Sequence, residues 1–219
     1  MIVQIYETQN CEEAKKLVEV GVDHIGVLVG NRENPREFGP EQAKEILRCV
    51  SGQAKKVVLS LSKNLQAIAE IVNKINPDIL HLGTAPESLS PQDVQSLKKQ
   101  FPNLKIMRSI PVNDETSVEL AKQYNEVANY LLLDTQKKDD TQVGATGKTH
   151  DWSISKRIVE SMSIPVVLAG GLGPDNVAEA VAVVKPFGVD SKTKTDNMGS
   201  HEKDIEKVRQ FVKLAKAIK

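Results

Sequence analysis

Short apolar runs alternate with helical patterns along the whole 219-residue chain. The runs are rich in β-branched residues and too short for helices, which is typical of strands buried on both faces. They cover residues 2–6, 24–29, 56–61, 78–82, 104–110, 130–133, 164–168 and 187–189. Segments with apolar residues at helical spacing lie between them, at residues 11–20, 40–50, 65–75, 91–100, 115–124, 153–161, 175–184 and 202–218. This alternation predicts an α/β fold, a (β/α)8 TIM barrel occupying residues 1–219 as a single domain; an open doubly wound sheet is the alternative.

One of these units carries two consecutive glycines shortly after its strand. Gly170 and Gly171 follow the apolar run at residues 164–168, and a helical pattern begins a few residues later. Glycine tolerates positive φ and lets backbone N–H groups approach a ligand, and the start of a helix adds a partial positive charge. The segment therefore predicts an anion site. A tight strand-to-helix connection without a ligand is the alternative.

The overall composition argues against several partners. Basic and acidic residues balance, with 29 of each, so no net field favours nucleic acid or an anionic membrane. The first nine residues lack the basic and apolar regions of a signal peptide, and no apolar run is long enough to span a membrane. Cys11 and Cys49 are far apart in sequence and lack the spacing of metal ligands. These features predict a cytoplasmic protein with reduced cysteines and no metal site.

Polar residues at the carboxyl ends of the predicted strands are the candidates for chemistry, because barrel active sites lie there. Asp134 directly follows an apolar run, and partial burial would raise the pKa of its carboxyl group and suit it to general-acid work. An aspartate that caps the following loop is the alternative. His81 is a second candidate for proton transfer, and a hydrogen-bonded structural histidine is the alternative there.

Four segments of the chain carry a family resemblance. They read NPR and GPEQA at residues 34–43, LLD at 132–134, GATGKTHDW at 144–152, and GGLGPDNV with VKPFGVD at 170–190. These segments resemble motifs of the phosphoribosylanthranilate isomerase family, for example its G-G-T-G-K-T-F-D-W. The resemblance extends over nearly the whole chain and implies a (β/α)8 barrel.

The resemblance implies an Amadori rearrangement, which converts an aminoaldose phosphate into an aminoketose phosphate in tryptophan biosynthesis without a cofactor. Asp134 would be the general acid, and Arg36 would contact the anthranilate carboxylate, since a guanidinium pairs well with that group. The other candidates for substrate binding are Tyr6, Arg108, Gly144 and Gly147. The candidates for phosphate binding are Gly170, Gly171, Ser191, Lys192 and Lys194. The expected partner is a small phosphorylated substrate, and the protein is expected to be a monomer or a homodimer.

The sequence departs from the family at the general base. The family opens K-I-C-G-I-T, and a gapless register from Gly21 places Tyr6 at the catalytic cysteine. A phenol with a pKa near ~10 is a poor base at neutral pH. Glu7 and His81 are the candidates to replace it. Three functions remain open: an isomerase with an altered base, an enzyme for another phosphorylated metabolite, and a barrel that only binds such a metabolite.

Overall fold

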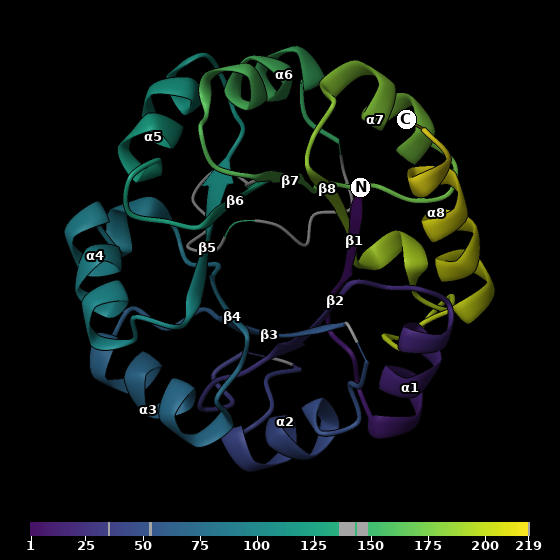
Figure 1. The fold of residues 1–219 in the computed structure, drawn as a ribbon. Helices are drawn as coiled ribbons and strands as arrows, with labels where there is room; N and C mark the ends of the chain where they lie inside the picture. The colour runs from purple at the N-terminus through teal and green to yellow at the C-terminus, as the bar shows by residue number, and fades with distance from the viewer. Residues whose placement is uncertain (35, 53, 136–142, 144–148, 219) are drawn as a thin grey trace.

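A computed structural model describes residues 1–34, 36–52, 54–135, 143 and 149–218. The described strands run parallel and close into a barrel in sequence order, with β1 pairing both β2 and β8 (Figure 1). This result confirms the predicted TIM barrel and excludes the open sheet. The strands are β1 (Ile2–Ile5), β2 (His24–Leu28), β3 (Lys55–Ser60), β4 (Ile79–Leu82), β5 (Lys105–Pro111), β6 (Tyr130–Asp134), β7 (Val166–Leu168) and β8 (Gly188–Ser191).

A ring of helices surrounds the barrel, one after each strand (Figure 1). The helices are α1 (Cys11–Glu19), α2 (Pro40–Leu47), α3 (Leu65–Ile75), α4 (Pro91–Gln100), α5 (Thr116–Tyr124), α6 (Trp152–Ser161), α7 (Val177–Val184) and α8 (Ile205–Ala217). Two single 3₁₀ turns, η1 (Pro86–Ser88) and η2 (Thr193–Thr195), follow β4 and β8. Helices α3 and α4 have the predicted bounds, and the others differ from the prediction at one or both ends.

Local signals in the sequence explain where several helices begin and end. The Asn10 side chain accepts a hydrogen bond from the backbone N–H of Glu13 and so caps α1. Ser90 and Asp93 form a reciprocal capping box at the start of α4. Gly21, just after α1, has a φ of +87°, the left-handed conformation expected at the end of that helix.

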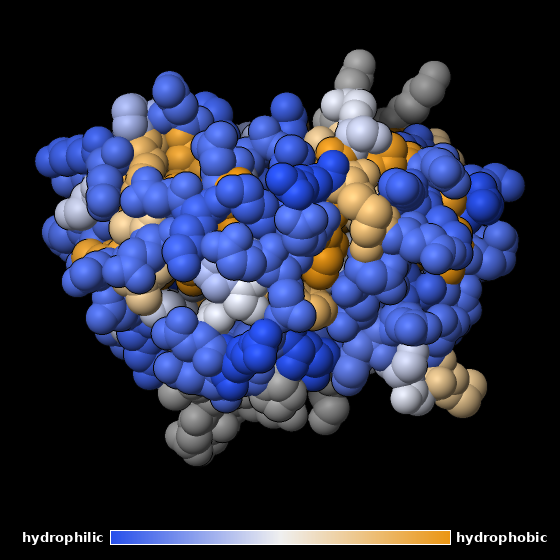
Figure 2. All heavy atoms as spheres, turned by 90° about the horizontal axis from the view of Figure 1, so that it is seen from below, coloured by the Kyte–Doolittle hydropathy of each residue, from blue (hydrophilic) through white to orange (hydrophobic). Residues whose placement is uncertain are grey.

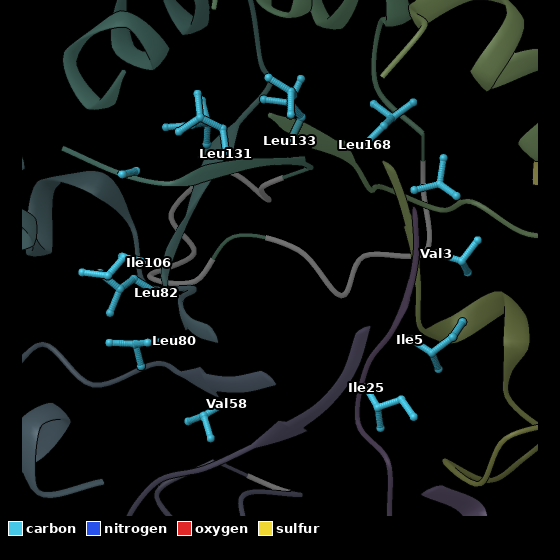
Figure 3. Close-up of a cluster of buried hydrophobic side chains, with 14 of the residues drawn as sticks. Val3, Ile5, Ile25, Val58, Leu80, Leu82, Ile106, Leu131, Leu133 and Leu168 are labelled. Carbon is cyan, nitrogen blue, oxygen red and sulfur yellow. The ribbon is translucent and has the colours of Figure 1, made fainter. Parts of the chain in front are cut away.

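Two apolar layers hold the barrel together. The larger layer lies between the strands and the helices, and side chains such as Val3, Ile25 and Leu131 point outward into it (Figure 3). The smaller layer lies inside the barrel. Its buried members are Tyr6, Val57, Ile79, Met107, Leu132, Val167 and Ala169. Because side chains alternate along a strand, neighbours of these inward residues face the helices.

The two cysteines form a disulfide bond, which corrects the prediction that they are reduced. Cys11 is the first residue of α1, and Cys49 lies just beyond α2. Helices α1 and α2 are neighbours around the barrel. The Cα atoms of the two cysteines are therefore 5.4 Å apart, although 38 positions separate the cysteines in sequence. That Cα distance is usual for a disulfide.

Few large apolar side chains are exposed among the residues that the structure describes. The face seen in Figure 2 is mostly hydrophilic, and its hydrophobic residues form separate patches. Within the described ranges, no helix is long and apolar enough to cross a membrane.

Candidate active site

A cavity of about 280 Å³ opens at the carboxyl ends of the strands. It brings together residues from β4, β6 and β8, from the segment after β1 and from the β2–α2 connection. Of the residues predicted from the sequence, Tyr6, Glu7, Arg36, His81, Asp134 and Lys192 line it. The remaining lining residues are Leu28, Asn34, Leu59, Leu61, Leu132, Val143 and Asp190. The cavity therefore has a charged part and a part walled by leucines.

Asp134, the last residue of β6, carries the titratable group best suited to acid catalysis. Burial raises the pKa of its carboxyl group from 3.8 to about 7, although hydrogen bonds from Thr135 oppose the rise. Those hydrogen bonds come from the Thr135 backbone N–H, at 2.7 Å, and from its hydroxyl, and both end on Oδ1. A carboxyl with a pKa near 7 is protonated in a useful fraction of molecules at neutral pH.

A second buried carboxyl group, Asp190 on β8, lies in the same cavity. Burial first, and then the charge of Asp134, raise its pKa well above the ordinary value. The Gln4 side-chain amide donates to Asp190 Oδ1 at 3.2 Å. Sequence reasoning left Asp190 out of the candidate site, although its place directly after an apolar run is the same signal that identified Asp134.

Tyr6, which the predicted register places at the family's cysteine, is enclosed by protein. Its ring packs where a side chain on Gly26 of β2 would collide with it. Its hydroxyl lies 2.6 Å from His81 Nδ1, and His81 Nε2 lies 2.7 Å from the Ser109 hydroxyl. Burial raises the pKa of Tyr6 well above 10.0, so the phenol stays protonated, and we assign it as the donor to Nδ1.

This arrangement makes His81 a weak candidate for the general base. Burial first, and then the positive charge of Arg108, lower the pKa of His81 to about 3. Both ring nitrogens are also engaged, one by Tyr6 and the other by Ser109. The geometry favours a structural role for His81, in which it holds the Tyr6 ring in place.

Glu7 and Arg36 form an ion pair that sequence reasoning did not predict. Arg36 binds the Glu7 carboxylate through two nitrogens: Nε contacts Oε2, and Nη2 lies 3.2 Å from Oε1. Lys192 Nζ is 3.5 Å from Oε2 of the same carboxylate and 3.3 Å from Asp196 Oδ2. The Glu7 side chain is only 6% exposed, whereas that of Arg36 is 27% exposed.

The backbone at Glu7 is in the left-handed region, with a φ of +60°. The register that aligns Tyr6 with the family's cysteine aligns Glu7 with the glycine after it, and glycine adopts this conformation freely. A glutamate there costs roughly 1–2 kcal/mol. The alignment of Glu7 with a glycine of the family was the signal in the sequence for this backbone conformation, although it does not indicate the pairing with Arg36.

The predicted phosphate residues surround the carboxyl ends of β7 and β8. Gly170 and Gly171 have φ values of +85° and +62°, and no described residue accepts a hydrogen bond from either backbone N–H. The Ser191 hydroxyl donates to the Leu172 carbonyl at 2.6 Å, and Lys194 Nζ lies 2.6 Å from Asp175 Oδ2. Lys192 is the member of this group that lines the cavity.

Three of the predicted substrate-binding residues need separate comment. Arg108 lies on the helix-facing side of β5, where its guanidinium donates to the carbonyls of Leu82 and Thr84 and lies over the Tyr124 ring. It is not among the residues that line the cavity, so its contact with substrate stays a prediction. Its neighbour Met107 faces inward, and side-chain alternation then sends Arg108 outward. Gly144 and Gly147 lie outside the described residues.

No group of three or more histidine, cysteine, aspartate or glutamate side chains among the described residues is arranged to hold a metal ion. The cavity instead combines an acid of raised pKa with a guanidinium and an ammonium group. This arrangement fits proton transfer on an anionic small molecule.

Fold and site together define a (β/α)8-barrel protein with a carboxyl-bearing cavity at the carboxyl ends of its strands. The sequence profile of the N-(5'-phosphoribosyl)anthranilate (PRA) isomerase family matches residues 3–214. The chain therefore belongs to that family.

Individual relatives from the same family are similar to this protein along its full chain. The N-(5'-phosphoribosyl)anthranilate isomerase of Methanocella arvoryzae is 33% identical over 218 residues, 99% of each chain. Among solved structures, monomers derived from the dimeric phosphoribosylanthranilate isomerase of Thermotoga maritima match with a TM-score of 0.80 at 26% identity, over 100% of both chains. A phosphoribosylanthranilate isomerase in complex with reduced 1-(o-carboxyphenylamino)-1-deoxyribulose 5-phosphate matches with a TM-score of 0.78 at 25% identity, also over 100% of both chains.

Proposed function

We propose that this protein is a phosphoribosylanthranilate isomerase, an intramolecular oxidoreductase that converts an aminoaldose phosphate into an aminoketose phosphate in tryptophan biosynthesis. The observation that carries the proposal is Asp134, a carboxyl group with a pKa of about 7 in the central cavity of a chain that belongs to this family. The names of its full-length relatives support the same activity.

In the proposed reaction, Asp134 acts as the general acid. Its O–H donates a proton to the furanose ring oxygen while the bond between that oxygen and the amine-bearing carbon breaks, and a Schiff base forms. A general base then removes the proton from the adjacent carbon, which gives an enolamine that ketonises. Glu7 suits the base position better than His81, because the His81 ring is engaged at both nitrogens and has a pKa of about 3.

The charged groups of the cavity suggest how the substrate would be oriented. We place the phosphate at the carboxyl ends of the paired strands β7 and β8, where Gly170 and Gly171 can offer backbone N–H groups and Lys192 an ammonium group. The aromatic ring would lie against the leucines of the cavity wall, with its carboxylate toward Arg36. The small-molecule ligand of the related complex carries both a carboxyphenyl group and a phosphate.

The biosynthetic role would place the protein in the cytoplasm, where disulfides such as Cys11–Cys49 are unusual. Whether it is a monomer or a homodimer stays a prediction; the Thermotoga maritima relative is described as dimeric.

Turnover of phosphoribosylanthranilate, followed by the loss of its fluorescence, tests the proposal. We expect the wild-type protein to be active, and we expect Asp134→Asn to lose at least 10²-fold in kcat, because the amide cannot donate a carboxylic proton. Asp114→Asn is the matched control, since Asp114 is exposed and lies outside the cavity lining. A folded wild-type protein without turnover would contradict the proposal and favour the second candidate, a barrel that acts on or binds another phosphorylated metabolite. The Glu7–Arg36 pair is the observation that keeps this second candidate open.

A further inference from the structure

The guanidinium group of Arg36 is already bound to a carboxylate that belongs to the protein. Both oxygens of Glu7 are engaged by it, in the geometry that a guanidinium also offers to the carboxylate of a ligand. We propose that Glu7 is a latent general base. Arg36 holds Glu7 in an ion pair until the carboxylate of the substrate binds Arg36 instead, and this exchange releases Glu7 toward the reacting carbon. This inference rests on the proposed isomerase function and specifies how the site is switched on.

The supply of positive charge in the cavity makes such an exchange necessary. Among the described lining residues, the cationic side chains are Arg36 and Lys192, and both already contact Glu7. Lys192 also pairs with Asp196, which is itself bound to the buried ammonium group of Lys203. An aromatic carboxylate lying against the leucines would be desolvated and would need a cation. Arg36 is the more exposed partner of its pair and can accept the incoming carboxylate.

Glu7 keeps one cationic neighbour after release. Lys192 Nζ, at 3.5 Å from Oε2, stays as a partner when Arg36 turns to the substrate. An ionised carboxylate near one ammonium group and within the cavity can accept a proton, whereas a carboxylate held at both oxygens by a guanidinium is a weaker acceptor. The exchange therefore converts Glu7 from a structural partner into a base.

The proton transfer itself balances within the substrate. Glu7 takes the proton from the carbon next to the Schiff-base carbon, and the electron pair of that C–H bond forms the new carbon–carbon double bond. The electron pair of the C=N double bond moves to the protonated nitrogen, which becomes an amine. When the enolamine ketonises, its hydroxyl loses a proton and the former Schiff-base carbon gains one. No oxidant or external reductant is required.

The first test measures binding and does not depend on turnover. Anthranilate and aniline, which differ by the carboxylate, are titrated into wild-type protein and into Glu7→Gln, which keeps the shape of the side chain but removes its charge. We expect Glu7→Gln to bind anthranilate at least tenfold more tightly than the wild type, with aniline affinity unchanged. Equal or weaker binding of anthranilate would overturn the exchange. Glu12→Gln, at an exposed position of α1, is the control.

The second test measures turnover with two substrates, phosphoribosylanthranilate and the corresponding phosphoribosylaniline without the carboxylate. Wild-type protein should act on the first and be at least 10²-fold slower in kcat on the second, because Glu7 stays bound to Arg36. Arg36→Gln should lower kcat/KM for the first substrate but raise kcat for the second at least tenfold, because Glu7 is then free. Glu7→Gln should lose turnover of both. Arg32→Gln, which changes an exposed arginine of the same connection, should behave as the wild type.

The outcomes of these tests separate the two proposals. If wild-type protein does not turn over phosphoribosylanthranilate, the proposed function fails, and the binding measurements still decide whether a carboxylate competes with Glu7 for Arg36. If wild-type protein is active but Glu7→Gln retains its rate, Glu7 is not the base. If Arg36→Gln fails to accelerate the substrate without a carboxylate, Arg36 does not hold Glu7 inactive, and the latent-base mechanism is wrong.

Discussion

Replacing Asp134 by asparagine should stabilise the protein, and the gain should depend on pH. The folded protein raises the pKa of this carboxyl group from 3.8 to about 7, mainly through burial. A carboxyl group whose pKa is raised in the folded protein contributes its full stability only below its unfolded pKa. This stability is lost as the pH rises from the unfolded pKa through the folded pKa. Asparagine cannot ionise and keeps an oxygen that can accept from Thr135. The variant therefore avoids a penalty that develops in the wild type as the pH rises from 3.8 to about 7 and keeps its full size above that.

The size of this effect follows from the two pKa values. Moving from 3.8 to about 7 corresponds to roughly 4 kcal/mol when each tenfold change in proton affinity is worth about 1.4 kcal/mol. Asp134 lines a cavity that water can enter, so screening lowers the expected gain to about 2 kcal/mol. Loss of the Asp134 charge also removes one of the causes that raise the pKa of Asp190. This change lowers the cost of ionising Asp190 in the folded protein and therefore also stabilises the variant.

Urea unfolding of wild-type protein and Asp134→Asn at pH 4 and at pH 8.5, with the disulfide intact, measures this difference. We expect nearly equal free energies of unfolding at pH 4 and an advantage of about 2 kcal/mol for the variant at pH 8.5. A difference that is the same at both pH values would refute the reasoning, because it would show that the Asp134 carboxyl ionises in the folded protein as readily as in the unfolded chain.

Three further predictions concern pH, packing and the disulfide. If the proposed isomerisation is confirmed, its kcat should fall above about pH 7 as Asp134 loses its proton, and a rate that stays constant to pH 9 would contradict the acid role. Arg108→Met should lower the free energy of unfolding by about 2–3 kcal/mol in urea, through loss of hydrogen bonds to two carbonyls, while an unchanged substrate KM would agree with its position outside the cavity. Replacing Cys11 and Cys49 together by serine should cost up to about 4 kcal/mol for a loop closed over 38 positions, and dithiothreitol should destabilise the wild type but not the double variant.

The fold could be predicted from the sequence because its signals are local. Apolar runs and helical spacing repeat within each βα unit, and caps such as Asn10 mark helix starts without reference to the rest of the chain. The ends of elements were less predictable. Helix α8 begins at Ile205 because Asp204 caps it, accepting hydrogen bonds from the backbone N–H groups of Glu206 and Lys207, whereas apolar spacing alone extended the prediction to residue 202.

The site was predictable in its residue types but not in its pairings. Asp134 could be identified because it directly follows an apolar run of the sequence, and it is the last residue of β6. The contact between Glu7 and Arg36 spans 29 positions and depends on a left-handed backbone at Glu7, which the identity of the residue does not reveal. The helix-facing position of Arg108 was not predicted because the side-chain alternation of β5 was not applied. The disulfide was missed because its cysteines were judged by sequence spacing and not by the adjacency of α1 and α2.

The bond between Cys11 and Cys49 makes this part of the molecule a covalent ring. Arg36 lies inside the ring, and Glu7 lies on the chain just before it. Cleavage of a single peptide bond at the exposed residues 31–33 would therefore separate the backbone that carries Glu7 from the backbone that carries Arg36, yet the two pieces would stay joined. Such a nick would be invisible on a gel without reductant, and the two partners of the ion pair would remain tethered on one molecule.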